Sequence, residues 1–160
     1  MIKLKFKPMD EESTQTVLHW NYDPPYDVYN LSNENHEEIT ACLMAPANHY
    51  YQMLDEQDDL VAFCCFGEEG QVPGGDYRGD CLDVGLGVRP DLTGHGLGQD
   101  FASSVVIFGQ EEFSPSAFRV TIASFNFRAI RVWRKLGFRH TQIFKRTRDK
   151  MNFVVMIKER

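Results

Sequence analysis

Three glycines alternate with single residues where a β-rich segment passes into a helical one. They are Gly94, Gly96 and Gly98, within VRPDLTGHGLG (88–98). The first turn of a helix leaves about four backbone N–H groups without partners and carries partial positive charge. Glycines let an anion approach these groups and permit the positive φ angles that turn successive N–H groups inward. The stretch is therefore a candidate phosphate cradle, although a glycine-rich turn without a ligand fits the same pattern.

The common phosphate-binding motifs do not fit these glycines. A Walker loop, G-x-x-x-x-G-K-[ST], needs a lysine that this stretch lacks. A dinucleotide fingerprint, G-x-G-x-x-G, fails at Gln99 when counted from Gly94, and at Pro90 when counted from Gly85. A nucleotide-binding protein is therefore disfavoured.

The strand expected before the glycines, CLDVGLGV (81–88), carries a single carboxylate. Alternation along a strand puts Asp83 on the same face as Gly85 and Gly87, opposite three apolar side chains. A carboxylate beside two glycines suits an open cavity better than a packed core. The other interpretation is a strand-edge carboxylate exposed to water.

Aromatic and acidic side chains cluster near the N-terminus, in WNYDPPYDVY (20–29). The residues are Trp20, Tyr22, Tyr26 and Tyr29, with Asp23 and Asp27. Such a wall would attract an ammonium group through charge and cation–π interaction. A proline-rich turn capped by packed aromatic rings is the alternative.

The elements that must position these residues follow from hydrophobic periodicity and turn residues. Strands are expected at 2–7, 49–56, 60–66, 81–88, 118–123, 140–146 and 151–158, and helices at 10–20, 34–44, 96–113 and 126–136. The order β-α-α-β-β-β-α-β-α-β-β predicts one α/β domain over residues 1–160, a mixed sheet with helices on both faces.

Three local signals refine this prediction. Asp10 is expected to cap the first helix, and Gly137 to end the last one in a left-handed conformation. The glycine-rich segment 67–80 is expected to form a long, mobile, lid-like loop.

The composition bounds the class of protein. With 42% hydrophobic and 25% charged residues, the chain of 160 residues has the composition of a soluble globular protein. No apolar run approaches a membrane span or a signal peptide, so a cytoplasmic location without membrane contact is expected. A formal net charge of −6 argues against nucleic-acid binding. The four cysteines have no metal-ligand spacing, so no metal site is expected.

A second motif lies downstream of the glycines. The pair RPDLTGHGLG and NFRAIRVWRKLGF resembles the GNAT superfamily of acetyl-CoA-dependent N-acetyltransferases. The first family motif falls on Thr93–Gly98, with threonine in place of the usual Arg or Gln. The second comprises Asn126, the pair Ala129-Ile130, and Lys135–Phe138. The two motifs span residues 81–138, and the resemblance implies a mostly antiparallel sheet flanked by helices.

The resemblance implies acetyl-CoA as cosubstrate and assigns its contacts. The pyrophosphate would bind main-chain N–H groups of Gly94, His95, Gly96, Leu97 and Gly98, and Thr93 would cost the site one side-chain contact. The backbone of Leu86, Gly87 and Val88 would pair with the pantetheine arm. A main-chain N–H near Val88 would polarise the thioester carbonyl, as an oxyanion site does.

Other residues have open roles under the same resemblance. Asp83 matches the acidic residue that many members use as a base. Asn126 matches a coenzyme contact, and is equally suited to cap a helix. Arg128 and Arg131 could meet phosphates or face solvent. Trp133 stands where many members carry a tyrosine acid, and could pack in the core or against the pantetheine arm.

The activity implied is transfer of an acetyl group to a primary amine by direct attack in a ternary complex. A small-molecule amine and a protein N-terminal amine both remain open as acceptors, and a homodimer is possible. The alternative is a non-catalytic acyl-CoA-binding sensor or interaction module on the same fold.

Overall fold

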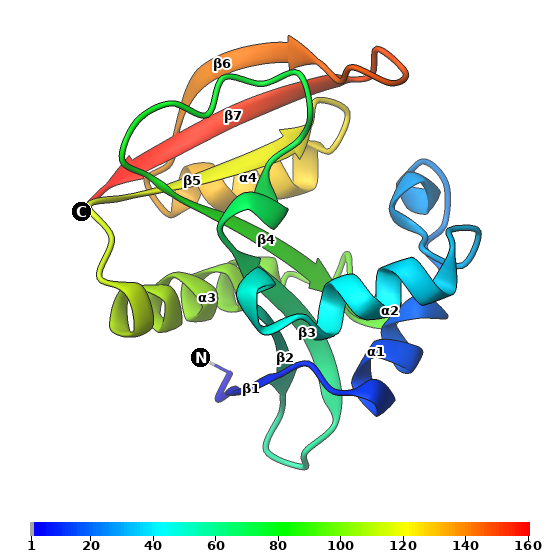
Figure 1. Cartoon of the computed structure of the whole chain (residues 1–160). Helices are drawn as coiled ribbons and strands as arrows, with labels where there is room; N and C mark the ends of the chain where they lie inside the picture. The colour runs from blue at the N-terminus through cyan, green and yellow to red at the C-terminus, as the bar shows by residue number, and fades with distance from the viewer. Residues whose placement is uncertain (1) are drawn as a thin grey trace.

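A computed structural model describes residues 2–160. Their seven strands form a single sheet with the order β1-β2-β3-β4-β5-β7-β6 (Figure 1). The strands are β1 Lys5–Pro8, β2 Tyr50–Leu54, β3 Leu60–Phe66, β4 Leu82–Val88, β5 Ala117–Ala123, β6 Arg139–Lys145 and β7 Asn152–Glu159. Only β4 and β5 pair in parallel; the other five pairings are antiparallel. The predicted mostly antiparallel sheet is confirmed.

Four α-helices complete the predicted order. They are α1 Glu11–Leu18, α2 His36–Met44, α3 Gly98–Phe113 and α4 Phe127–Lys135. Four short 3-10 turns lie between elements: η1 Tyr26–Tyr29, η2 Pro46–Asn48, η3 Glu68–Gly70 and η4 Pro90–Leu92. The helix expected from residue 96 begins at Gly98, because Gly94 and Gly96 have φ angles of 75° and 78° and cannot be helical.

The predicted helix ends are confirmed. The Asp10 carboxylate accepts a hydrogen bond from the Ser13 backbone N–H at 2.8 Å, within a capping box at the start of α1. Gly137 has φ 99°, and the Phe138 N–H donates to the Trp133 carbonyl at 3.1 Å, which closes the end of α4.

Helices cover both faces of the sheet, but unevenly. The large core lies under α3 and α4, and Cys64 and Phe66 of β3 belong to it. The next residue on the other face, Phe63, contacts a smaller cluster that contains Val17 and Trp20 beside α1. This second helical layer covers the β1–β3 half of the sheet only (Figure 1).

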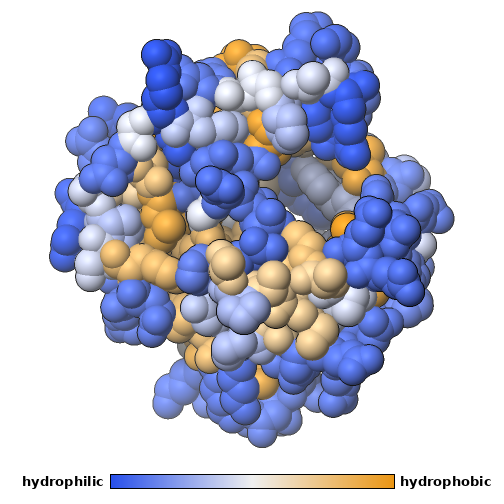
Figure 2. All heavy atoms as spheres, in the orientation of Figure 1, coloured by the Kyte–Doolittle hydropathy of each residue, from blue (hydrophilic) through white to orange (hydrophobic). Residues whose placement is uncertain are grey.

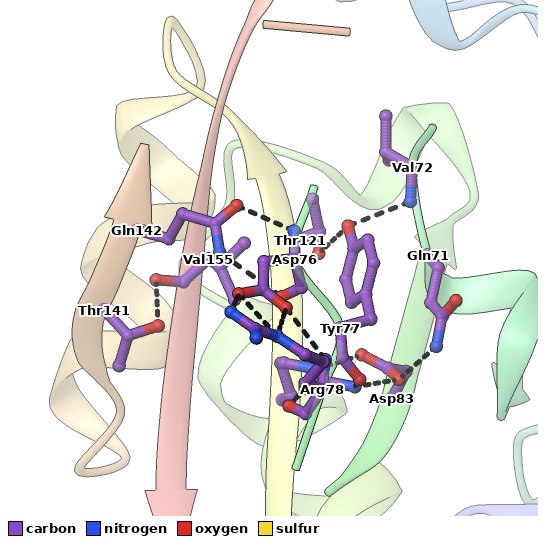
Figure 3. Close-up of polar contacts among 11 residues, drawn as sticks. Gln71, Val72, Asp76, Tyr77, Arg78, Asp83, Thr121, Thr141, Gln142 and Val155 are labelled. Atoms are coloured by element: carbon purple, nitrogen blue, oxygen red, sulfur yellow. Dashed lines mark hydrogen bonds and ion pairs between the residues drawn. The ribbon is translucent and has the colours of Figure 1, made fainter. Parts of the chain in front are cut away.

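A loop replaces the second helical layer over β5, β7 and β6. The Tyr77 hydroxyl and Thr121 Oγ1 lie 2.8 Å apart, and the Asp76 backbone N–H donates to Gln142 Oε1 at 2.9 Å (Figure 3). The Thr147 backbone N–H donates to the Pro73 carbonyl at 3.0 Å. The expectation of a lid-like segment at 67–80 is therefore wrong: the loop is hydrogen-bonded across the sheet and serves as its cover.

One further property concerns membranes. Within residues 2–160, none of the helices combines the length and apolarity that crossing a bilayer requires.

Candidate functional site

A slot opens between the two parallel strands. The β4–β5 register begins at Leu82 and Phe118 and stops at Val84 and Val120. Beyond these pairs β4 continues to Val88 and β5 to Ala123, and the strands diverge (Figure 1). The last four residues of β4 therefore have β3 on one side and no strand on the other.

The ladder between β3 and β4 determines which backbone groups face this slot. The Arg89 N–H donates to the Val61 carbonyl at 2.9 Å, opposite it on β3. Because inward and outward groups alternate along an antiparallel strand, Gly87 also bonds to β3, whereas Leu86 and Val88 direct their N–H and C=O groups into the slot. Three residues were predicted to pair with a pantetheine arm through their backbone, and for Gly87 this prediction is wrong because its backbone groups face β3. Its lack of a side chain instead makes room for the ring of Phe63.

A tyrosine from the N-terminal aromatic segment lies at the slot. The Tyr22 hydroxyl donates to the Val88 carbonyl at 2.6 Å. Burial raises the pKa of Tyr22, so the hydroxyl stays protonated through the neutral range. Its ring packs edge-on against Tyr29, with the ring centroids 6.5 Å apart. The aromatic segment at 20–29 thus reaches the last residue of β4, which leads into the glycine loop.

The glycine loop ends at a helix start that no side chain caps. The N-cap position of α3 is Leu97, and no side chain bonds the free N–H groups of the first turn. A Cβ on Gly96 would meet no atom within 4 Å, so the loop is open to an approaching group. His95 is exposed, and the Thr93 hydroxyl donates to the Pro90 carbonyl at 2.7 Å. The arrangement fits an anion held by main-chain N–H groups.

The start of α4 adds a cation and an amide beside this loop. A Cβ on Gly94 would lie 2.9 Å from Arg128 Nη1, so this guanidinium borders the loop, and it also lies 4.0 Å from the centre of the Tyr26 ring. Asn126 Oδ1 accepts from the Ala129 N–H at 3.1 Å, which confirms the helix cap. Its Nδ2 donates to the Tyr29 hydroxyl at 3.1 Å. Arg131 is exposed.

Asp83 does not face an open cavity. Its carboxylate accepts from Arg119 Nε at 2.6 Å and Nη2 at 2.7 Å, and both side chains are 3% exposed. Gln71 Nε2 donates to the same carboxylate at 2.9 Å (Figure 3). The remaining Arg119 nitrogen donates to the Arg78 carbonyl at 2.9 Å. The expected environment is wrong, because the parallel register sets Asp83 directly opposite a buried arginine.

Arg119 is not among the residues predicted from the sequence. Each of the two strands carries one charged residue in an otherwise uncharged run, LDVGLGV and AFRVTIA. Opposite single charges in two apolar strands are a signal for a buried ion pair, since an unpaired charge there would be costly.

Trp133 lies in the main core. Its side chain is 5% exposed and packs edge-on against Phe138, with ring centroids 5.0 Å apart. The ring has almost no surface left for a coenzyme, so the expected contact with a pantetheine arm is not supported.

The inventory of metal-ligating side chains is short. Across residues 2–160, no group of three or more His, Cys, Asp or Glu residues is arranged to hold a metal ion. The four cysteines are free thiols.

Comparison with known structures gives the same architecture. A chimera of spermidine N-acetyltransferase SpeG from Vibrio cholerae and hSSAT is 13% identical, with a TM-score of 0.76 over 98% of this chain and 95% of that one. An acetyltransferase (GNAT family) from Bacillus anthracis is 16% identical, with a TM-score of 0.70 over 99% and 97%. AAC(6')-Ib, in complex with ribostamycin and coenzyme A, is 13% identical, with a TM-score of 0.76 over 98% and 93%.

Comparison with sequences gives the family. No curated protein matches the chain closely enough to be counted a relative. The family model described as Acetyltransferase (GNAT) family matches residues 14–138, which include β4, the glycine loop, α3 and α4. The chain therefore belongs to the GNAT family of acetyltransferases.

Proposed function

We propose that this chain transfers an acetyl group from acetyl-CoA to the nitrogen of a primary amine. The observation that carries the proposal is the slot beside β4. There the backbone groups of Leu86 and the N–H of Val88 face away from β3 and lead to the glycine loop at the uncapped start of α3. The AAC(6')-Ib structure holds coenzyme A on the same fold, which supports acetyl-CoA as the donor here.

The residues present suit the parts of acetyl-CoA. The free N–H groups of α3 and the guanidinium of Arg128 fit a pyrophosphate by charge and by hydrogen bonding. The backbone groups of Leu86 and the N–H of Val88 suit the amides of an extended arm, as an unpaired strand edge does for a peptide. The N–H of Val88 would polarise the thioester carbonyl and stabilise the charge that develops on its oxygen.

The proposal assigns no proton transfer to Asp83. Its oxygens accept three hydrogen bonds from Arg119 and Gln71, and the carboxylate is buried. The ammonium group of the acceptor loses one proton to solvent, and the neutral nitrogen then attacks the thioester carbonyl. As the C–N bond forms and the C–S bond breaks, the nitrogen loses a second proton to solvent and CoA leaves as the thiolate. The activity at acidic pH should then follow the ionisation of the acceptor itself.

We propose that Tyr22 donates a hydrogen bond to the leaving thiolate at the slot, in place of the family tyrosine that Trp133 replaces. Burial raises the pKa of Tyr22, so its hydroxyl keeps its proton while it stabilises the charge. Changing Tyr22 to phenylalanine should lower turnover by about tenfold to 100-fold, the size of one lost hydrogen bond to a charged group. Affinity for acetyl-CoA should hold, because the ring remains. Steady-state kinetics together with calorimetry measure the two quantities. Full activity in the phenylalanine variant would show that Tyr22 does not stabilise the leaving thiolate.

Trp133 has no such role in this proposal. The Trp133→Phe variant should stay folded and keep its turnover within about tenfold of the parent, since phenylalanine retains an apolar ring in the core. Steady-state rates and circular dichroism on the same preparation check this. A folded variant that binds acetyl-CoA normally and loses a thousandfold in turnover would give the indole N–H a direct role.

The release of free CoA thiol from acetyl-CoA, in the presence of a panel of amines, tests the proposal. We expect amine-dependent release and a product acetylated on nitrogen, identified by mass spectrometry. Tight binding of acetyl-CoA without release for any amine would favour the non-catalytic acyl-CoA-binding module. Absence of binding would overturn the assignment of the slot.

A further inference from the structure

One strip of the central strand is left uncovered on the sheet face that carries Asp83. The second helical layer lies over β1–β3, and the loop before β4 lies over β5, β7 and β6, so the strip from Gly85 to Val88 falls between them (Figure 1). Gly85 and Gly87 are half-exposed, although β4 is the middle strand of seven. A Cβ on Gly85 would meet only one atom within 4 Å, the Sγ of Cys65. The two glycines thus keep the strip open.

The strip leads to the slot. Its last residue, Val88, accepts the hydrogen bond from the Tyr22 hydroxyl. Figure 2 shows this face hollowed between the β5–β7 side of the molecule and the N-terminal helical segment, next to the end of β4. A molecule whose nitrogen is acetylated at the slot can therefore extend back along the strip toward Gly85.

A carboxylate lies at the other end of the strip. Glu69 Oε1 accepts hydrogen bonds from the Cys42 thiol at 2.7 Å and from the Tyr50 hydroxyl at 3.0 Å. Tyr50 pairs with Cys65, and Cys65 pairs with Gly85, so this row of residues leads from the carboxylate to the strip. Burial, and after it the charge of Glu69, raises the pKa of the Cys65 thiol to about 12, as a carboxylate close to the strip would do.

The two hydrogen bonds hold Glu69 in place but leave its charge uncompensated. Both donors are neutral groups, and burial, followed by the bond to Glu69, raises the pKa of the Cys42 thiol to about 11. Within residues 2–160, no nitrogen of Lys, Arg or His lies within 4.0 Å of this carboxylate. Arg119 lies on the same face of the sheet, but its guanidinium is committed to Asp83 and to two backbone carbonyls.

The segments beside the strip bring no cation to Glu69. Residues 8–77, which include α1, α2, β2, β3 and η3, hold fifteen of the 23 Asp and Glu residues and none of the 17 Lys and Arg residues. Such a segment attracts cations and repels anions. Charge complementarity therefore favours a positively charged occupant of the strip.

We propose that Glu69 binds a second cationic nitrogen of the acceptor, so that the acceptor is a chain with two positively charged nitrogens. The inference rests on the proposed acetyl transfer and names its substrate class. Three residues separate Gly85 from Val88, so the two nitrogens would lie about 10 Å apart along the strip. The first nitrogen is acetylated at the slot. The second keeps its charge and donates to Glu69, and the carbons between them pass over the two glycines beside the Phe63 ring.

Amines of one chain length test the substrate class. Hexanediamine is compared with hexylamine, aminohexanol and aminohexanoate, which carry no polar group, a hydroxyl and a carboxylate at the far end. After halving for its two identical ends, the diamine should have a kcat/KM higher than the two neutral-ended amines by about tenfold or more, the size of a charged hydrogen bond. Aminohexanoate should be the poorest acceptor. The advantage of the diamine should shrink above about 0.15 M salt.

Chain length tests the position of the second nitrogen. Diamines with four to ten carbons are each compared with the monoamine of the same length, so that the apolar contribution of the chain cancels. The advantage should pass through a maximum, because the second nitrogen reaches Glu69 only when the chain spans the strip.

Two neighbouring glutamates provide the variant and its matched control. Glu69→Gln removes the charge and keeps an oxygen for Cys42 and Tyr50. It should lower the ratio of kcat/KM for the diamine to that for the monoamine by about tenfold and leave the KM for acetyl-CoA unchanged. Glu68→Gln removes the same charge from the adjacent exposed residue of η3 and should keep the ratio of the parent. Thermal melts check that both variants are folded.

The outcomes separate this inference from the proposed function. Release of CoA with the amines, but without an advantage for the diamine, overturns the subsite and leaves acetyl transfer intact. An equal change of the ratio in the two glutamine variants, or no change in either, also overturns the subsite. Failure of every amine to release CoA overturns the proposed function, and the subsite with it.

Discussion

Replacing Gly96 by glutamate is expected to weaken the binding of acetyl-CoA by at least about 100-fold, or about 2.7 kcal/mol. Gly96 has φ 78°, and the space around its Cα is open. A glutamate there would put bulk and negative charge where the N–H groups of the loop must meet an equally negative pyrophosphate. The only contacts that the glutamate would displace are those to the coenzyme, because no protein atom lies within 4 Å of a Cβ at this position.

A matched control separates this effect from backbone strain. Gly79 also has a positive φ, 99°, and a Cβ there would also meet no atom within 4 Å. Gly79→Glu therefore carries the same type of strain and the same added charge, in a loop on another part of the molecule. We expect both variants to lose about 1 kcal/mol of stability, and only Gly96→Glu to lose affinity. Calorimetry and thermal melts measure both. Equal CoA affinity in the two folded variants would contradict the anion cradle.

The glycine loop and the order of elements could be predicted from the sequence because they depend on neighbours along the chain. A strand, three spaced glycines and an amphipathic run suffice to place the start of α3 within two residues. Asn126 is another local case, since the preference of asparagine for helix caps identified its bond to the Ala129 N–H. Periodicity and turn chemistry operate within one element, so one sequence is enough to read them.

The partner of Asp83 could not be predicted in the same way. Asp83 and Arg119 are 36 residues apart and meet through the register between two strands, which alternation alone does not determine. The same holds for Gly87, whose face was predicted but whose hydrogen-bonding side depends on the β3 ladder. The cover formed by the loop at 67–80 also depends on distant partners, among them Thr121 and Gln142. Its glycines suggested mobility, whereas Gly74 permits a close approach to the Lys145 carbonyl.

Replacing Arg119 by methionine is expected to destabilise the protein by about 3–5 kcal/mol, a large part of the stability of a typical domain. The carboxylate of Asp83 would remain 3% exposed without its charge partner. Two backbone carbonyls, of Tyr77 and Arg78, would also lose their donor, so the loop over the sheet would loosen. Urea unfolding measures the change. A loss below about 1 kcal/mol would mean that water reaches the carboxylate when the arginine is removed.

The double variant Asp83→Leu/Arg119→Met tests whether the pair acts as a unit. Removing Arg119 alone leaves a buried charge without its partner, whereas removing both charges leaves none. The free energy of unfolding of the double variant should therefore be higher than that of Arg119→Met by about 2 kcal/mol or more. The two single losses would then not add, which is the signature of a direct interaction.

The single variant Asp83→Asn separates structure from catalysis. Because the carboxylate is committed to Arg119 and Gln71, we expect a lower melting temperature and an unchanged turnover per folded molecule. The acidic limb of the pH–rate profile should stay where it is, since it belongs to the acceptor amine. A hundredfold loss of turnover in the folded variant, with loss of that limb, would instead make Asp83 the base and would require its ion pair to open during the reaction.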